Sequence, residues 1–262
     1  MSETIQAGVL YVVSTPIGNL ADISARAVKV LSGVDLIAAE DTRTSRILLQ
    51  HLDIAKPLVS FFSHNEIRRV PELIEKLRTG ISVALITDAG TPGISDPAFS
   101  IVRGAIANHI RVIAVPGASA LLAALVTSGL PMDRFVFEGF LPVKKGRQSR
   151  LKELQREERT IVLYESPHRL CKTLDDLLQA FGEREIVVAR EMTKHFEEIV
   201  RGTITTVRET FRAKEPRGEI VIVIAGFDPR PNRREENPTE ELHGKNGHRR
   251  SHIGRHRPPD AI

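Results

Sequence analysis

The sequence predicts an α/β protein with two α/β domains: an N-terminal parallel, doubly wound sheet and a C-terminal mixed sheet, with a ligand-binding cleft between them. Short apolar runs rich in β-branched residues alternate with helical patterns along the first half of the chain. These runs are almost uninterrupted by polar residues, as expected for strands that helices cover on both faces. Most of them lead directly into a polar motif, and in open parallel sheets ligands bind beyond the carboxyl ends of the strands.

Residues 1–117 form the predicted N-terminal domain, with strands expected at 8–14, 34–39, 58–62, 82–87 and 110–115. Two intervening segments carry apolar residues at helical spacing: Ile23, Ala27, Val30 and Leu31 on the first, and Ile67, Val70, Ile74 and Leu77 on the second. A further helix is expected to begin near Asp96 and Pro97, because aspartate is a favourable N-cap and proline is favoured at the first helical position.

Residues 118–226 form the predicted C-terminal domain. Strands are expected near 135–139, 160–164, 185–190, 197–202 and 219–226, and a helix near 168–181. The two strands that follow Gly182 are too close for a helical crossover, which predicts an antiparallel or mixed sheet. Cys171 lies on the apolar face of the helix, where we expect it to be a small buried hydrophobe.

Residues 227–262 are rich in charges and prolines and poor in apolar residues. Such a segment cannot bury enough surface to offset the entropy of ordering it, so we predict a basic, disordered tail. Its histidines 248, 252 and 256 are spaced for one helix face, but no cysteine or acidic cluster completes a metal site. No metal is therefore expected.

The composition narrows the class of protein. No segment reaches the roughly 20 apolar residues that span a bilayer, and the N-terminus lacks the features of a secretory signal. A single cysteine fits a reducing compartment, so we expect a cytoplasmic protein without membrane association. The net charge of +4 is concentrated at 144–150 and 243–257, which favours a polyanionic partner such as nucleic acid.

Six polar motifs follow predicted strands and point to one extended site: TPIGN (15–19), AEDTR (39–43), DAGTPGISDP (88–97), PGAS (116–119), ESPHR (165–169) and REMTK (190–194). The fingerprints GxGxxG and GxxxxGK[ST] are missing, so neither a Rossmann dinucleotide site nor a P-loop is supported. The loops use proline and glycine instead, which let a backbone approach a ligand closely.

Together with HNE (64–66), EGFLP (138–142) and YESPHR (164–169), these motifs resemble those of the ribosomal RNA small subunit methyltransferase I family, over roughly residues 8–226. The family belongs to the tetrapyrrole-methylase-like enzymes that use S-adenosylmethionine (SAM). The resemblance implies two α/β domains with a cofactor cleft between them and a homodimer. It also implies 2′-O-methylation of the cytidine at position 1402 in the decoding region of 16S rRNA, within the small ribosomal subunit.

The resemblance also assigns cofactor contacts by motif. They are Thr15, Pro16, Gly18, Asn19, Asp88, Ala89, Gly90, Thr91, Pro92, Ser119, Ala120, Tyr164 and Ala189. Asp88 could accept a hydrogen bond from the ammonium or a ribose hydroxyl of SAM. The alternative for Asp88 is a structural role in the turn after its strand, which is common for aspartate.

A ribose hydroxyl is a poor nucleophile and gains from a proton acceptor. Glu165, Glu191 and His168 are the candidates, each at an expected strand exit. Structural ion pairs are the alternative, with Arg169 for Glu165 and with Lys194 for Glu191.

Basic residues near the predicted site are candidate RNA contacts through phosphate. They are Arg43, Arg46, Lys144, Lys145, Arg147, Arg150, Arg169 and Lys194. Arg43 could instead pair with Glu40 or Asp41 and rigidify its loop, and 144–150 could be an ordinary solvated linker.

Two other functions compete with rRNA methylation. One is a small-molecule methyltransferase of the tetrapyrrole type, which would share the cofactor site and differ in its acceptor. The other is a non-catalytic RNA-binding assembly factor. The complete TPIGN, DAGTP and PGAS loops favour an enzyme.

Overall fold

The computed structural model describes residues 4–213 and 216–229. By its contacts the chain divides into Met1–Phe227, which holds both sheets, and Asp228–Ile262. The predicted disordered tail, apart from its first three residues, lies outside the described residues. The proposed division of the sheet-bearing part at residue 117 stays a prediction.

The first sheet is entirely parallel, with strand order β3-β2-β4-β1-β5. Its strands are β1 (Leu10–Val13), β2 (Leu36–Ala39), β3 (Leu58–Ser60), β4 (Val83–Ile86) and β5 (Val112–Val115). The intervening helices are η1 (Leu20–Asp22), α1 (Ala25–Gly33), α2 (Thr42–His51), α3 (Glu66–Arg78) and α4 (Phe99–Ala107). Every strand lies within a range predicted from its apolar run.

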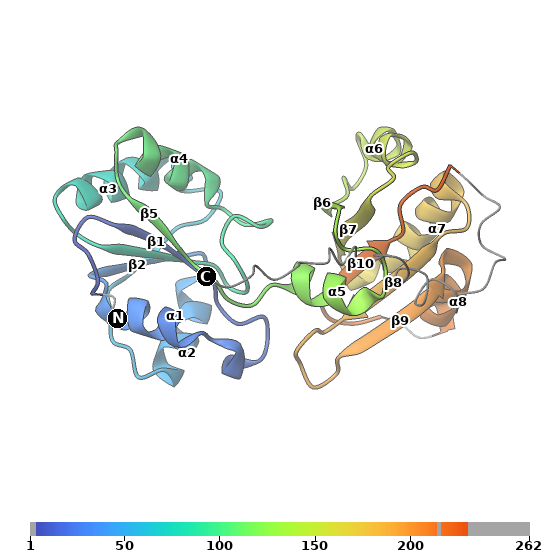
Figure 1. Ribbon diagram of the computed structural model, residues 1–262. Coiled ribbons are helices and arrows are strands. Elements are labelled where there is room, and N and C mark those ends of the chain that lie inside the picture. The colour runs from blue at the N-terminus through green and yellow to red at the C-terminus, as the bar shows by residue number, and fades with distance from the viewer. Residues whose placement is uncertain (1–3, 214–215, 230–262) are drawn as a thin grey trace, which may run out of the picture. The chain divides into compact units, whose positions relative to one another are not determined.

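Helices cover both faces of this sheet, which confirms the doubly wound arrangement. Alternate side chains of β1 separate the two cores: Tyr11 packs with α1 and α2, and Leu10 packs with α3 and α4. Figure 1 shows the same division, with α1 and α2 on one side of the strands and α3 and α4 on the other. Because both faces are buried, the strands have no polar side.

The second sheet is mixed, as predicted, with strand order β6-β7-β10-β8-β9. Only β6 and β7 pair in parallel among its described strands. Its strands are β6 (Phe135–Phe140), β7 (Thr160–Glu165), β8 (Glu185–Arg190), β9 (Glu198–Thr203) and β10 (Ile220–Ile224). Its helices are α5 (Ala120–Ser128), α6 (Arg147–Leu154), η2 (Pro167–Arg169), α7 (Leu170–Phe181) and α8 (Ile204–Ala213).

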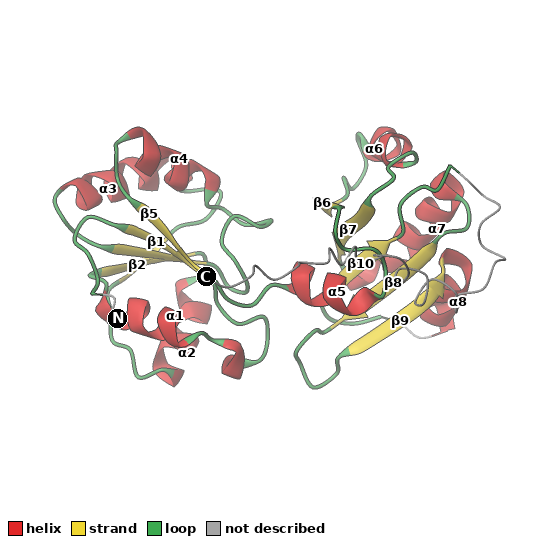
Figure 2. Ribbon diagram, in the orientation of Figure 1, coloured by secondary structure: helices red, strands yellow, loops and turns green. Residues whose placement is uncertain are grey.

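Helices α6, α7 and α8 pack on one face of the second sheet and α5 packs on the other (Figure 2). The core on the α5 side also contains Ile17, which comes from the loop after β1. Cys171 is only half-buried against the opposite core, and its thiol donates to the Phe211 carbonyl at 3.6 Å.

Two local predictions were wrong. Helix α4 begins at Phe99 with Ala98 as its N-cap, so Asp96 does not cap it. The reason is burial: Ala98 is only 3% exposed and packs in the core, which delays the helix past Pro97. Ile67 is 96% exposed, because the buried face of α3 runs instead through Leu73, Ile74 and Leu77.

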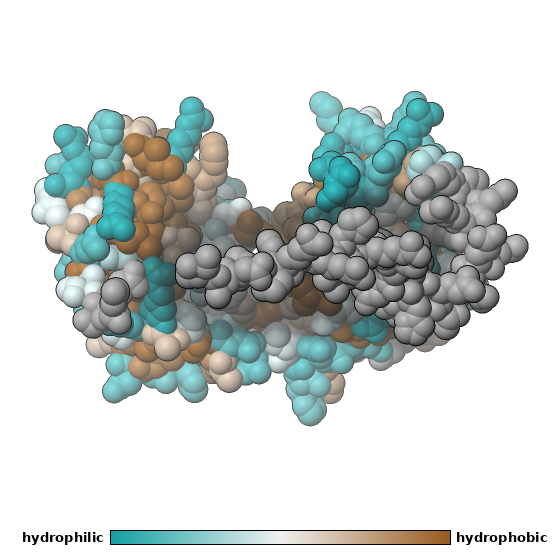
Figure 3. Space-filling model, in the orientation of Figure 1, coloured by the Kyte–Doolittle hydropathy of each residue, from teal (hydrophilic) through white to brown (hydrophobic). Residues whose placement is uncertain are grey.

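The surface carries some exposed apolar side chains. Figure 3 shows apolar atoms gathered over α4 and β5, where Phe99 and Ile106 are 74% and 62% exposed. No helix within the described ranges combines the length and the apolar character needed to cross a membrane.

Arg147 fixes α6 to α7 from inside the protein. Its side chain is buried, and its guanidinium donates to Asp176 and Thr173, each at 2.7 Å, and to the Pro142 carbonyl at 3.2 Å. Removing one partner of a buried ion pair leaves the other charge uncompensated.

Replacing Arg147 with methionine is expected to lower the free energy of unfolding by about 3 kcal/mol, measured by urea denaturation. Lys145→Met is the matched control, because Lys145 is exposed two residues before the start of α6. Equal stability of the two variants would contradict a structural role for Arg147.

Candidate functional site

The loops after β1 and β4 are joined by a short backbone bridge. The Thr15 N–H donates to the Gly90 carbonyl at 2.8 Å, and the Gly90 N–H donates to the Thr15 carbonyl at 3.1 Å. The buried Thr15 hydroxyl adds a hydrogen bond to the Thr87 carbonyl at 3.1 Å. Gly90 has a φ of +83°, a conformation that glycine adopts without strain. The TPIGN and DAGTP motifs therefore form one structural unit.

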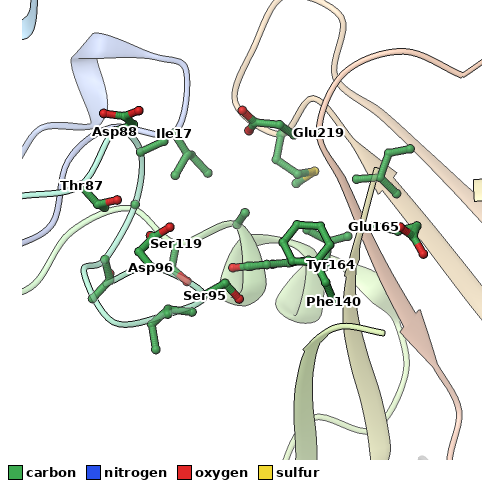
Figure 4. A pocket seen from close by; sticks show the side chains of 18 of the residues that line it. Ile17, Thr87, Asp88, Ser95, Asp96, Ser119, Phe140, Tyr164, Glu165 and Glu219 are labelled. Carbon is green, nitrogen blue, oxygen red and sulfur yellow. The ribbon is translucent and has the colours of Figure 1, made fainter. Parts of the chain in front are cut away.

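A cavity of about 420 Å³ opens at this unit. Its walls come from the loops after β1, β2, β4 and β5, and from β6, β7, β10 and the turn after β8 (Figure 4). It brings together a large part of the predicted cofactor residues: Asp88, Ala89, Gly90, Thr91, Ser119, Ala120 and Tyr164. Residues from both sheets thus meet at one cavity, as the strand-exit motifs predicted.

The other predicted cofactor residues lie elsewhere. Pro16 and Gly18 line an adjoining cavity of about 240 Å³, and Pro92 lines a third one beside α4. Asn19 accepts a hydrogen bond from the Ala21 N–H and caps η1. Ala189 is fully buried in the core of the second sheet and does not reach the cavity lining.

Two lining side chains have clear structural partners. The Asp88 carboxylate accepts a hydrogen bond from the Asp41 N–H at 3.1 Å and so braces the start of α2. The Ser119 hydroxyl accepts from the Leu122 N–H at 3.5 Å and caps α5. These bonds hold the polar loops in place around the cavity.

Glu165 lines the cavity, but its carboxylate points away from it (Figure 4). The side chain is buried and accepts hydrogen bonds from the Thr173 hydroxyl at 2.5 Å and the Ser166 N–H at 2.8 Å. Arg169 lies 3.3 Å from the same carboxylate. The ion pair considered as an alternative role for Glu165 is present.

Glu191 also has an ion-pair partner. Its Oε1 accepts from Lys194 Nζ and from the Glu219 N–H, both at 2.9 Å. Burial lowers the pKa of Lys194, but these acidic neighbours outweigh burial and raise it above its usual value. Neither Glu191 nor the exposed His168 is part of the cavity lining.

Sequence reasoning missed three carboxylates that do line the cavity, Glu40, Asp96 and Glu219. Burial and the nearby negative charge of Glu40 raise the pKa of Asp96 to about 6. Asp96 pairs with no Lys, Arg or His within the described part of the chain. Asp96 resembles a helix N-cap in the sequence because Pro97 follows it. Glu40 lies in the AEDTR motif, where the sequence suggests only an ion pair with Arg43.

Some of the predicted RNA-contacting residues are exposed, and others are held by hydrogen bonds or ion pairs within the protein. Arg43, Arg46, Lys144 and Lys145 are exposed, and Arg43 pairs with Asp41 at 2.6 Å. Arg150 pairs with Glu138 and Glu153, each at 2.6 Å, and Arg169 donates to the Leu141 carbonyl at 2.8 Å. The structure does not bring Arg147 to the surface with its basic neighbours.

The chain is similar to proteins of known family and to solved structures. The family described as Tetrapyrrole (Corrin/Porphyrin) Methylases matches residues 9–208. Among solved structures, a cobalt precorrin-4 methyltransferase of cobalamin biosynthesis has a TM-score of 0.60 at 19% identity, covering 83% of this chain and 95% of its own. The uroporphyrin-III C-methyltransferase from Thermus thermophilus, complexed with S-adenosylhomocysteine, has a TM-score of 0.61 at 18% identity, covering 83% and 97%. At these identities the likeness shows a common fold.

Curated relatives are much closer in sequence, and the three described next, like others, carry the name ribosomal RNA small subunit methyltransferase I. The protein from Synechocystis sp. is 53% identical, covering 90% of this chain and 86% of its own. The protein from Pseudomonas aeruginosa is 51% identical (85% and 80%), and that from Thermotoga maritima 48% identical (84% and 99%). The chain therefore belongs to the tetrapyrrole methylases and, among them, to the ribosomal RNA small subunit methyltransferase I family.

Proposed function

We propose that this protein is a SAM-dependent methyltransferase that methylates the 2′ oxygen of a cytidine, position 1402, in the decoding region of 16S rRNA. One observation carries the proposal. Over 84–90% of its length, the chain is about half identical in sequence to relatives named ribosomal RNA small subunit methyltransferase I. The small ribosomal subunit is the proposed partner.

The cavity has the properties that SAM requires. Its volume of about 420 Å³ falls within the range of small-molecule sites. Apolar side chains such as Ile17, Met192 and Val221 offer a surface for the adenine ring, while Glu40 and Asp96 favour a cationic ligand. The solved relative that holds S-adenosylhomocysteine supports the same cofactor here. When bound, SAM supplies a methyl group activated by its sulfonium.

Two properties of Asp96 support a role as proton acceptor for the ribose hydroxyl. It lines the cavity, and its raised pKa of about 6 lies near the working pH, where general bases are most effective. The candidates from the sequence, Glu165, Glu191 and His168, remain proposals, although two are held in ion pairs and the third is outside the lining. We therefore add Asp96 to them and rank it first.

A homodimer and a cytoplasmic location remain part of the proposal. Both derive from the family resemblance and the single cysteine rather than from a contact within the chain. Light scattering on the purified protein tests the dimer directly.

The cofactor site is tested by filling the cavity. Ala120→Leu places a larger side chain in the lining and is expected to weaken SAM binding at least tenfold in isothermal titration calorimetry. Ala107→Leu is the matched control, because Ala107 is exposed at the end of α4. With labelled SAM and small subunits lacking the modification, the wild type is expected to label one decoding-region ribose. An absence of SAM binding by the wild type would overturn the proposal.

The proton acceptor is tested by the pH profile. Because Asp96 must be ionised to accept a proton, wild-type kcat is expected to fall about tenfold per pH unit below about pH 6. Asp96→Asn is expected to lower kcat about 100-fold or more and to abolish this fall, while SAM affinity changes less than tenfold. An unchanged profile in Asp96→Asn would exclude this role, and Asp133→Asn at an exposed site is the control.

A further inference from the structure

The adjoining cavity of about 240 Å³ lies between the loop after β1 and helix α2. It shares Ile17, Thr87, Asp88, Ala89 and Glu219 with the larger cavity, so the two spaces have a common wall. A ligand in the smaller cavity would therefore be a neighbour of the ligand in the larger one. We call the smaller space the α2 cavity.

One residue that lines the α2 cavity, Ser45, carries a buried hydroxyl that lacks a partner among the described residues. Ser45 is 3% exposed and lines the cavity, and its Oγ makes no hydrogen bond to any residue that the structure describes. An unpaired buried hydroxyl is costly, and native proteins contain few of them. A ligand that hydrogen-bonds to Ser45 would recover this free energy.

The remaining lining suits an apolar ring. Ile17 comes from the loop after β1, Leu20 begins η1, and Ile47 and Leu48 come from α2. Leu20 and Ile47 are 40% and 67% exposed, so they lie at the solvent side of the cavity, whereas Ile17 and Leu48 are buried. A nucleobase combines apolar ring faces with a hydrogen-bonding edge, and this combination matches the lining.

Positive charge lies on the same helix. Arg46 follows Ser45 directly and is exposed, and Arg43 is exposed one position before the lining residue Thr44. Lys194 lines the cavity from the turn after β8. Arg43 pairs with Asp41, and Lys194 pairs with Glu191 and Glu219. Asp88 and Glu219 also line the cavity, so Arg46 is the cation best placed to contact an RNA phosphate at its solvent side.

We propose that the α2 cavity takes the base of the methyl-acceptor nucleotide of an RNA, with Ser45 hydrogen-bonding to its edge and Ile47 contacting its face. This inference rests on the proposed function, because it assumes an RNA acceptor beside a cofactor in the larger cavity. It separates the two ligands: the larger cavity holds the methyl donor, and α2 selects the acceptor.

Two variants test the proposal in the full-length protein. Ser45→Ala is expected to lower kcat/KM for small subunits by about 3- to 10-fold, the effect of one lost neutral hydrogen bond. Ile47→Ala is expected to lower it roughly tenfold through lost apolar contact. Both should leave the Kd for SAM within twofold of wild type. Ile106→Ala is the control, because Ile106 is similarly exposed on α4 and should change neither quantity.

Stability measurements separate a binding role for Ser45 from a structural one. Since its hydroxyl has no partner in the described protein, Ser45→Ala should unfold at the same temperature as wild type or higher. A lower unfolding temperature would indicate a structural hydrogen bond and overturn the proposal. Weaker SAM binding by Ser45→Ala would likewise overturn it, because the cavity would then belong to the cofactor.

The acceptor base supplies the decisive comparison. Subunits with uridine in place of the acceptor cytidine should be poorer substrates for the wild type, and the ratio should shrink in Ser45→Ala. An identical ratio in both proteins would place the base elsewhere. A wild type that methylates no rRNA would refute the proposed function itself, whereas an active wild type with fully active Ser45→Ala and Ile47→Ala variants would refute only the α2 cavity as the base site.

Discussion

The reciprocal hydrogen bonds between Thr15 and Gly90 are the constraint on which the site depends. They join the loops after β1 and β4, two neighbouring strands of the first sheet, into one unit. Ile17 extends from this unit into the core of the second sheet and lines both cavities. One bridge therefore holds the wall that the two cavities share, and we propose these cavities for the methyl donor and the acceptor base, whose relative position matters most in a transfer reaction.

Charge is distributed unevenly around these loops. Glu165 and Glu191 each face a cation, whereas burial and the nearby charge of Glu40 raise the pKa of both Asp88 and Asp96. Burial of like charges costs free energy, and a cationic ligand relieves it. The loops after β2 and β4 should therefore gain stability when such a ligand binds.

Much of this architecture could be predicted from the sequence, because a strand buried on both faces reads as an apolar run. The contacts that assemble the site could not, since Glu40 and Asp96 meet only through the order of strands in the sheet. Arg147 shows the opposite kind of error. Its neighbours are basic, but its spacing with Leu151 and Leu154 is that of one helix face, and all three are buried. This helical spacing indicates that Arg147 is buried, but the basic residues around it suggested an exposed RNA-contacting stretch instead.

Gly18 illustrates how a contact between distant segments restricts the chain. A Cβ at this position would collide with the aliphatic stem of Lys194, and the backbone φ of +136° disfavours any side chain. Lys194 is in turn held by Glu191 and Glu219 and cannot easily move aside. The two positions should consequently vary together during evolution: a homologue with a larger residue at the position of Gly18 needs a shorter one at the position of Lys194. Engineering that alters the β1 loop alone will meet the same restriction.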